Sequence, residues 1–140
     1  MNMGYACINM HLSYPQKYGG KEKGVKPITT GRSTIRRTFD TKGVDYASEL
    51  TLQNVKDLNR IVQWNVLNGY EFYRMSSGLA PWKTEYEWED LKDLDEIKAY
   101  FRSVGWVADT HNIRLTSHPG PFNVLVSPKE DVVENCIKDL

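Results

Sequence analysis

Hydrophobic residues along the chain gather into three short stretches with few charges, which is the pattern of β-strands. Parallel strands buried on both faces form nearly continuous apolar runs, whereas half-buried strands alternate apolar and polar positions. The first stretch is nearly continuous, and the other two alternate. We therefore predict strands over residues 3–10, 70–77 and 113–117.

Two longer stretches have the 3.6-residue period of helices that bury one face. In residues 48–68 the apolar positions form one stripe that ends before Gly69, a plausible C-terminal cap, and in residues 88–110 a second stripe runs to Ala108. A third helix is expected from Ser127, because a proline and acidic residues follow this capping residue. Strands and helices thus alternate, which favours an α/β fold with a parallel sheet.

The chain has 140 residues, the length of one ordinary domain, and its 40% hydrophobic content is compatible with a core. Its first residues do not form a basic region followed by an apolar core, and no run approaches the ~18 apolar residues of a membrane span. We therefore expect a soluble cytoplasmic protein that is not secreted. Cys7 and Cys136 have no metal-binding spacing and are interpreted as small hydrophobic residues.

Residues 12–46 show neither the helical nor the strand period and are rich in glycine, serine, threonine and lysine. This composition predicts a long basic loop between the first strand and the first helix, in which residues 33–38 can form a short helical turn. Within it, residues 17–37 contain seven basic side chains and one acidic side chain, although the whole chain has 18 of each sign. Such a run can bind DNA phosphates, or it can simply be solvated. The candidate phosphate contacts are Lys17, Lys21, Lys23, Arg32, Arg36 and Arg37.

Residues 85–96 are the acidic counterpart of this loop, with seven acidic side chains and one lysine. Carboxylates near the start of a helix are stabilised by the helix dipole and by water. We therefore interpret this run as structural rather than catalytic.

One histidine lies where the third predicted strand ends. The strand must stop after His118, because Pro119 cannot donate a hydrogen bond to a sheet and Gly120 favours a turn. Ligands and metals collect at the carboxyl ends of parallel strands, and Ser76 and Ser77 fall at the same edge. His118 is therefore a candidate metal ligand, and a histidine hydrogen-bonded beneath a loop is the alternative.

Five blocks of the sequence follow one another in the order found in a known family. They are GYACINM at 4–10, TIRRT at 34–38, Asn54 with Leu58 and Asn65, FYRMSS at 72–77 with Pro81 and Trp82, and SHPG at 117–120 with SPK at 127–129. Together they resemble the N-terminal part of the UV damage endonucleases. The resemblance implies that residues 1–140 form a single partial domain, about three βα units of a TIM-like (xylose-isomerase-like) barrel with parallel strands.

The resemblance also implies a function. Members of this family are DNA repair endonucleases that nick double-stranded DNA 5′ to ultraviolet photoproducts with divalent metals, usually Mn²⁺, with Mg²⁺ or Zn²⁺ as alternatives. It implies that His118 is a metal ligand, which agrees with the affinity of neutral imidazole for manganese and zinc. It also implies that Tyr5 and Asn9 contact the lesion region, with Ser76 and Ser77 on the same functional face. A DNA repair enzyme would associate with the nucleoid.

The sequence departs from the family pattern after the His-Pro-Gly block. The family commonly has a glutamine and an aromatic residue there, a pair that wedges into the duplex opposite the lesion. This chain has Pro121 and Phe122. The phenyl ring can still stack as a wedge, but proline lacks the amide that could hydrogen-bond to bases, so we expect altered lesion reading at this pair.

The second departure is that a barrel needs eight βα units and this chain supplies about three. The family's other metal ligands lie on later strands, so His118 cannot hold a metal cluster alone. The chain is then a fragment of a longer product, half of a split enzyme completed by a second chain, or a decayed remnant. Its open sheet edge predicts marginal stability and self-association.

Two other functions remain open at this point: a non-catalytic DNA-binding protein, and a metal-dependent barrel enzyme that acts on sugars. Phosphate contacts make DNA affinity fall steeply with salt, whereas sugar binding does not. The salt dependence of ligand affinity therefore separates the sugar enzyme from both DNA hypotheses.

Overall fold

The computed structural model describes residues 3–20, 23–118 and 128–139. Their strands form one parallel sheet in the order β1-β2-β3, so neighbours in the sheet are also neighbours in the chain. The strands are β1 (Gly4–Ala6), β2 (Phe72–Ser76) and β3 (Arg114–His118). This arrangement confirms the predicted fold class, a partial parallel α/β barrel.

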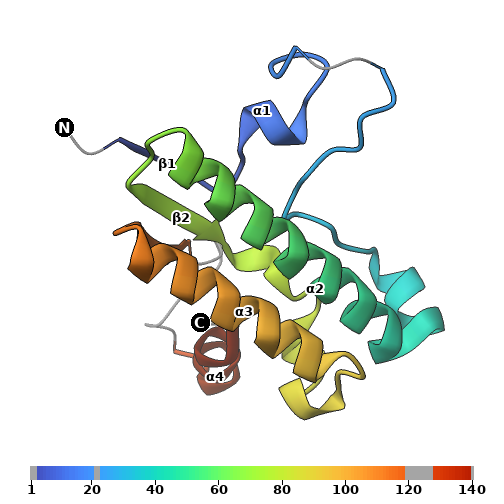
Figure 1. Cartoon of the computed structure of the whole chain (residues 1–140). Coiled ribbons are helices and arrows are strands. Elements are labelled where there is room, and N and C mark those ends of the chain that lie inside the picture. Colours follow the sequence, from blue (N-terminus) through green and yellow to red (C-terminus); the bar gives the residue numbers. More distant parts are fainter. Residues whose placement is uncertain (1–2, 21–22, 119–127, 140) are drawn as a thin grey trace.

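Two long helices, α2 (Arg36–Leu67) and α3 (Leu94–Thr110), lie side by side and connect the strands (Figure 1). The short helix α1 (Met10–Ser13) follows β1, and α4 (Glu130–Asp139) follows β3. The predicted helix start at Ser127 lies outside the described residues. None of the helices in the described part has the length and apolar content needed to cross a membrane.

The main core lies between the sheet and the two long helices. Tyr73, the second residue of β2, is fully buried there and packs among aliphatic side chains of both helices. The predicted stripes are confirmed, because the buried helix residues fall on them. The core consists of Leu58, Ile61, Val62, Tyr73, Val104, Val107, Ala108 and Ile113.

A second buried cluster lies at the other end of the two helices. It joins the first turns of α2 and α3 to the segment between β2 and α3 through Phe39, Ala47, Val55, Tyr86, Leu91 and Ile97. The rings of Phe39 and Trp82 stack with centroids 5.7 Å apart. This cluster fixes the basic start of α2 next to the acidic segment.

The predicted loop over residues 12–46 is wrong at both ends. Residues 10–13 form helix α1, and α2 already begins at Arg36. At Gly43 the backbone of α2 leaves the helical conformation with φ = 72° and divides the helix into two parts. Glycine adopts such angles without steric cost, and it interrupts the apolar period on which the prediction rested.

Two further boundaries differ from the prediction. β1 stops at Ala6 rather than continuing to Met10, because Cys7 takes the left-handed φ of 58°. α3 begins at Leu94, since residues 83–85 and 88–90 form separate 3₁₀ turns. The predicted cap at Gly69 is confirmed: Gly69 has φ = 71°, and the amides of Gly69 and Tyr70 donate to the carbonyls of Val66 and Asn65 at 3.4 and 3.0 Å.

Candidate active-site edge and nucleic-acid interface

The carboxyl edge of the sheet holds the predicted metal ligand. Parallel pairing of β2 and β3 places Ser76 directly beside His118. The Ser76 hydroxyl accepts a hydrogen bond from the Gly78 amide at 3.2 Å and so caps the short turn that contains Ser77. His118 and Ser76 are half-buried and Ser77 is exposed, so the structure brings these three predicted residues to one edge.

The face of the sheet opposite the helices carries two arginines that were not among the candidate site residues. In the pairing of β2 with β3, Arg74 lies opposite Thr116. Arg114 lies opposite Phe72, nearer the amino ends of both strands. The Arg74 Nε donates to the Ser117 carbonyl at 3.3 Å, and the Arg114 guanidinium lies 5.9 Å from the centroid of the Phe72 ring. A cavity of about 320 Å³ opens between these side chains. Within the described residues neither arginine has a carboxylate partner, so this face is positively charged.

The described residues do not contain a complete metal site. No three His, Cys, Asp or Glu side chains among them are grouped closely enough to hold a metal ion. The other two histidines lie elsewhere: His11 stacks on Trp64 with ring centroids 5.9 Å apart, and His111 caps the end of α3. The donor set of this part of the chain therefore does not fit a metal cluster by itself, and His118 supplies at most one ligand.

Tyr5 and Asn9 form an internal chain of hydrogen bonds. The Asn9 amide donates to the Tyr5 hydroxyl at 2.7 Å, and that hydroxyl donates to Oδ1 of the buried Asn65 at 2.6 Å. Asn9 also accepts from the Leu12 amide at 3.1 Å and thereby caps α1. Burial raises the pKa of Tyr5 to about 12 despite both side-chain hydrogen bonds. Tyr5 is thus a protonated structural bridge to α2 at neutral pH, and its contact with a lesion stays a prediction.

The predicted phosphate contacts divide into two groups. Arg32 and Arg36 are held by carboxylates of the chain itself. Arg36 pairs with Asp40 at 2.8 Å and with Glu85 at 3.0 Å, and the hydrogen bond with Glu85 is the main cause of its raised pKa. Lys17, Lys23 and Arg37 are exposed. Lys21, Pro121 and Phe122 lie outside the described residues.

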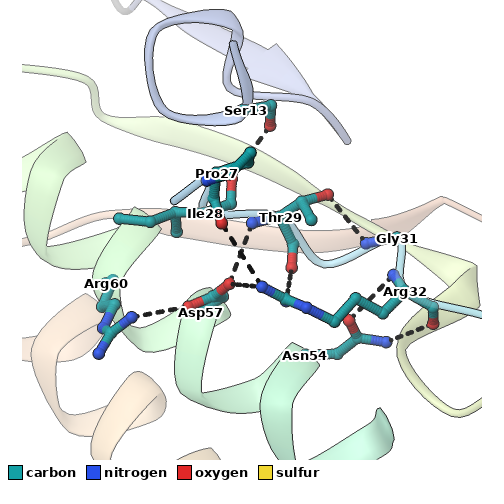
Figure 2. Close-up of polar contacts among 9 residues, drawn as sticks. All are labelled: Ser13, Pro27, Ile28, Thr29, Gly31, Arg32, Asn54, Asp57 and Arg60. Carbon is teal, nitrogen blue, oxygen red and sulfur yellow. Dashed lines mark hydrogen bonds and ion pairs between the residues drawn. The ribbon is translucent and has the colours of Figure 1, made fainter. Parts of the chain in front are cut away.

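Arg32 belongs to a network that fastens the basic segment onto α2 (Figure 2). Its guanidinium pairs at 2.7 Å with Asp57, whose side chain is 4% exposed and which also accepts from the Thr29 amide at 3.1 Å. The buried Asn54 accepts from the Arg32 amide at 3.0 Å and donates to the Arg32 carbonyl at 2.9 Å. Arg32 therefore anchors the segment and is not available to DNA in this arrangement.

The fold and the sheet edge define a class of protein, the parallel barrels that carry their site at the carboxyl ends of the strands. The family model for the UV-endonuclease UvdE matches residues 1–140. The chain belongs to that family, as the sequence resemblance predicts.

Curated relatives match the chain from end to end but are much longer than it. The UV-damage endonuclease of Schizosaccharomyces pombe is 35% identical over 99% of this chain, which covers 21% of that protein. The putative UV-damage endonuclease of Acanthamoeba polyphaga mimivirus is 33% identical over the whole chain, which covers 39% of that protein. The chain thus spans less than half the length of these relatives.

A solved structure supports the fold independently. The crystal structure of SacUVDE superposes on 99% of this chain with a TM-score of 0.71 and 22% sequence identity. This chain corresponds to 42% of that structure. At that identity the similarity shows the fold alone.

Proposed function

We propose that this chain is the N-terminal part of a DNA repair endonuclease that nicks double-stranded DNA 5′ to ultraviolet photoproducts. The observation that carries the proposal is the family match over residues 1–140, combined with a histidine and a serine paired at the carboxyl edge of the sheet. The relatives are named UV-damage endonucleases, and the proposal extends that activity to this chain. It places the protein in the cytoplasm with the nucleoid.

In this proposal divalent metal ions, Mn²⁺ rather than Mg²⁺ or Zn²⁺, would when bound supply an activated hydroxide and stabilise charge at the scissile phosphate. His118 contributes one ligand, and the others come from residues outside the described part, on the same polypeptide or on a second chain. Lys17, Lys21, Lys23 and Arg37 neutralise DNA phosphates. Phe122 stacks at the lesion, with Tyr5, Asn9 and Pro121 beside it.

The test is incision of an end-labelled, ultraviolet-irradiated duplex by the purified chain with Mn²⁺, with and without an equimolar C-terminal segment of the S. pombe relative. Lesion-dependent nicks that disappear in His118→Ala support the proposal. The matched control is His111→Ala, because His111 is an exposed histidine on the same chain at the end of α3. Equal loss of incision in both variants contradicts the role of His118.

A second function is a DNA-binding protein without catalysis. It is favoured by one observation, namely that the described residues contain no group of three metal-binding side chains. Salt-dependent binding of duplex DNA without incision, with Mn²⁺ and with the complementing segment, supports this function over the first. The family assignment gives no support to an enzyme that acts on sugars.

A further inference from the structure

The segment that follows α1 projects from the body of the molecule as an arm (Figure 1). We define the arm as the described residues 14–20 and 23–27. Its two ends are joined, because the Ile28 amide donates to the Leu12 carbonyl at 3.0 Å and the Ser13 hydroxyl donates to the Ile28 carbonyl at 3.1 Å. The network around Asp57 fixes the residues that follow (Figure 2). The arm is therefore held at its base by the rest of the fold.

Two tyrosines lie together on the first turn of the arm. The Tyr18 amide donates to the Tyr14 carbonyl at 3.0 Å, which places the two side chains on the same face of a helical turn. Their rings meet edge to face at 81° with centroids 6.2 Å apart, yet 49% of Tyr14 and 41% of Tyr18 is exposed. A Cβ at Gly19 would lie 2.8 Å from the His11 carbonyl, so this turn packs closely against α1. The rings thus form a fixed aromatic surface that faces solvent.

A cavity of about 300 Å³ adjoins this surface. Tyr14, Lys17, Val25 and Pro27 contribute to its walls. The Lys17 ammonium lies 5.0 Å from the centroid of the Tyr18 ring. The described residues between 10 and 35 include no acidic side chain. In the described part of the arm, apolar rings and the positive charge of Lys17 therefore occur at the same place.

We propose that the Tyr14–Tyr18 surface is a stacking site for an unpaired nucleotide of DNA, with Lys17 on its flanking phosphate. The proposal rests on the proposed function for the choice of DNA as partner, and it adds the kind of DNA recognised. A ring surface binds a base by its face, which is accessible in single-stranded or flipped-out nucleotides and covered in an intact duplex. Positive charge alone would bind both forms without distinction.

The test measures the affinity of the chain for a fluorescent single-stranded oligothymidylate and for an intact duplex of the same length. We expect the double variant Tyr14→Ala/Tyr18→Ala to lose roughly tenfold of its single-strand affinity, because each stacked base contributes appreciably to binding, and to keep its duplex affinity within about twofold. Tyr14→Phe/Tyr18→Phe keeps the rings and should retain binding. Lys17→Gln should lower the slope of log affinity against log salt by about one.

The chain offers a matched control on α2. The Lys42 ammonium lies 4.3 Å from the centroid of the Tyr46 ring, so the same pair of residue types occurs away from the arm. Tyr46→Ala should leave both affinities unchanged, and circular dichroism shows whether each variant is folded. Unchanged single-strand affinity in the folded double alanine variant overturns the stacking site, as does an equal loss for duplex.

The two proposals fail separately. Lesion-dependent incision together with tyrosine-independent single-strand binding overturns only the stacking site. Tyrosine-dependent single-strand binding by a chain that gives no incision in the first test counts only against the endonuclease proposal.

Discussion

The network around Asp57 and the carboxyl edge of the sheet are both polar, but only the first is complete within the described residues. Asp57 has two arginine partners, Arg32 at 2.7 Å and Arg60 at 3.1 Å, and it accepts a backbone amide as well. At the sheet edge, by contrast, His118 belongs to no group of three metal-binding side chains in the described part of the chain. Arg74 and Arg114 likewise face a cavity without a carboxylate partner in that part.

The difference between the two regions shows which contacts are formed among the described residues. Helix packing and the attachment of the arm depend on residues within one βα unit and its neighbours, and Nδ2 of Asn65 is the buried side-chain atom left without a hydrogen-bond partner among the described residues. The open face of the sheet carries positive charge that a closed barrel interior would have to neutralise, because an unpaired buried charge is costly. Within the described residues, stability therefore rests on the helix packing and on the network around Asp57, whereas the arginines on the open face of the sheet have no carboxylate partner there.

Removing the carboxylate of the closed network should give the largest effect. Asp57→Ala leaves Arg32 without its partner and the Thr29 amide without an acceptor, so we expect the free energy of unfolding to fall by about 3 kcal/mol. Urea denaturation followed by circular dichroism measures this change. The arm should also become more accessible to proteases, because its attachment is lost.

Asp40→Ala is the matched control for this variant. Asp40 forms an ion pair of nearly the same length, 2.8 Å with Arg36, but both side chains are about half exposed. Exposed pairs contribute little, so the expected change is below about 1 kcal/mol. If the two substitutions lowered the free energy of unfolding by similar amounts, the burial of Asp57 would not make its ion pair more stabilising than the exposed pair of Asp40.

The helices and strands could be predicted because each carries its own local signal. The spacing of apolar residues predicts the stripe from Leu58 to Asn65. The proline and glycine that follow His118 in the sequence predict that the third strand ends at this residue. At the start of α2 only a short helical turn near residues 33–38 was predicted, because the first turns of the helix are basic and Gly43 breaks their period. α1 was missed because a helix of four residues is too short to show a period.

The site could be predicted only in part, for a different physical reason. His118 and Ser76 meet because both end parallel strands, which is a rule of the fold. The pairing of Arg32 with Asp57 joins a residue of the loop before α2 to a residue 25 positions later on that helix, and no local pattern encodes the path of the loop. The hydrogen bond from Tyr5 to Asn65 is also not encoded locally. Its only sign in the sequence was that Asn65, a polar residue, falls on the apolar stripe of the helix.

Two glycine substitutions compare a tight contact in the sheet with free space on a helix. A Cβ at Gly4 would lie 2.4 Å from the Phe72 carbonyl oxygen, so Gly4→Ala must displace β1 and should cost about 2 kcal/mol. A Cβ at Gly105 would meet no atom within 4 Å, so Gly105→Ala inside α3 should stabilise the fold by about 0.5 to 1 kcal/mol. Thermal denaturation gives both values. Destabilisation by Gly105→Ala would show that α3 has a partner surface at that position.

The last prediction concerns pH and the hydrogen-bond chain through Tyr5. Burial raises the pKa of Tyr5 from 10.0 to about 12, so the unfolded state loses this proton first as pH rises. The contribution of Tyr5 is therefore constant below pH 10, and it is lost between pH 10 and about 12. Tyr5→Phe should lower stability at pH 7 by about 1 kcal/mol, because Asn9 and Asn65 lose their shared partner. It should also make the alkaline decline shallower, and urea titrations at pH 8, 10 and 11 measure both effects. An unchanged alkaline decline would mean that the Tyr5 hydroxyl is as accessible to water in the folded chain as in the unfolded one.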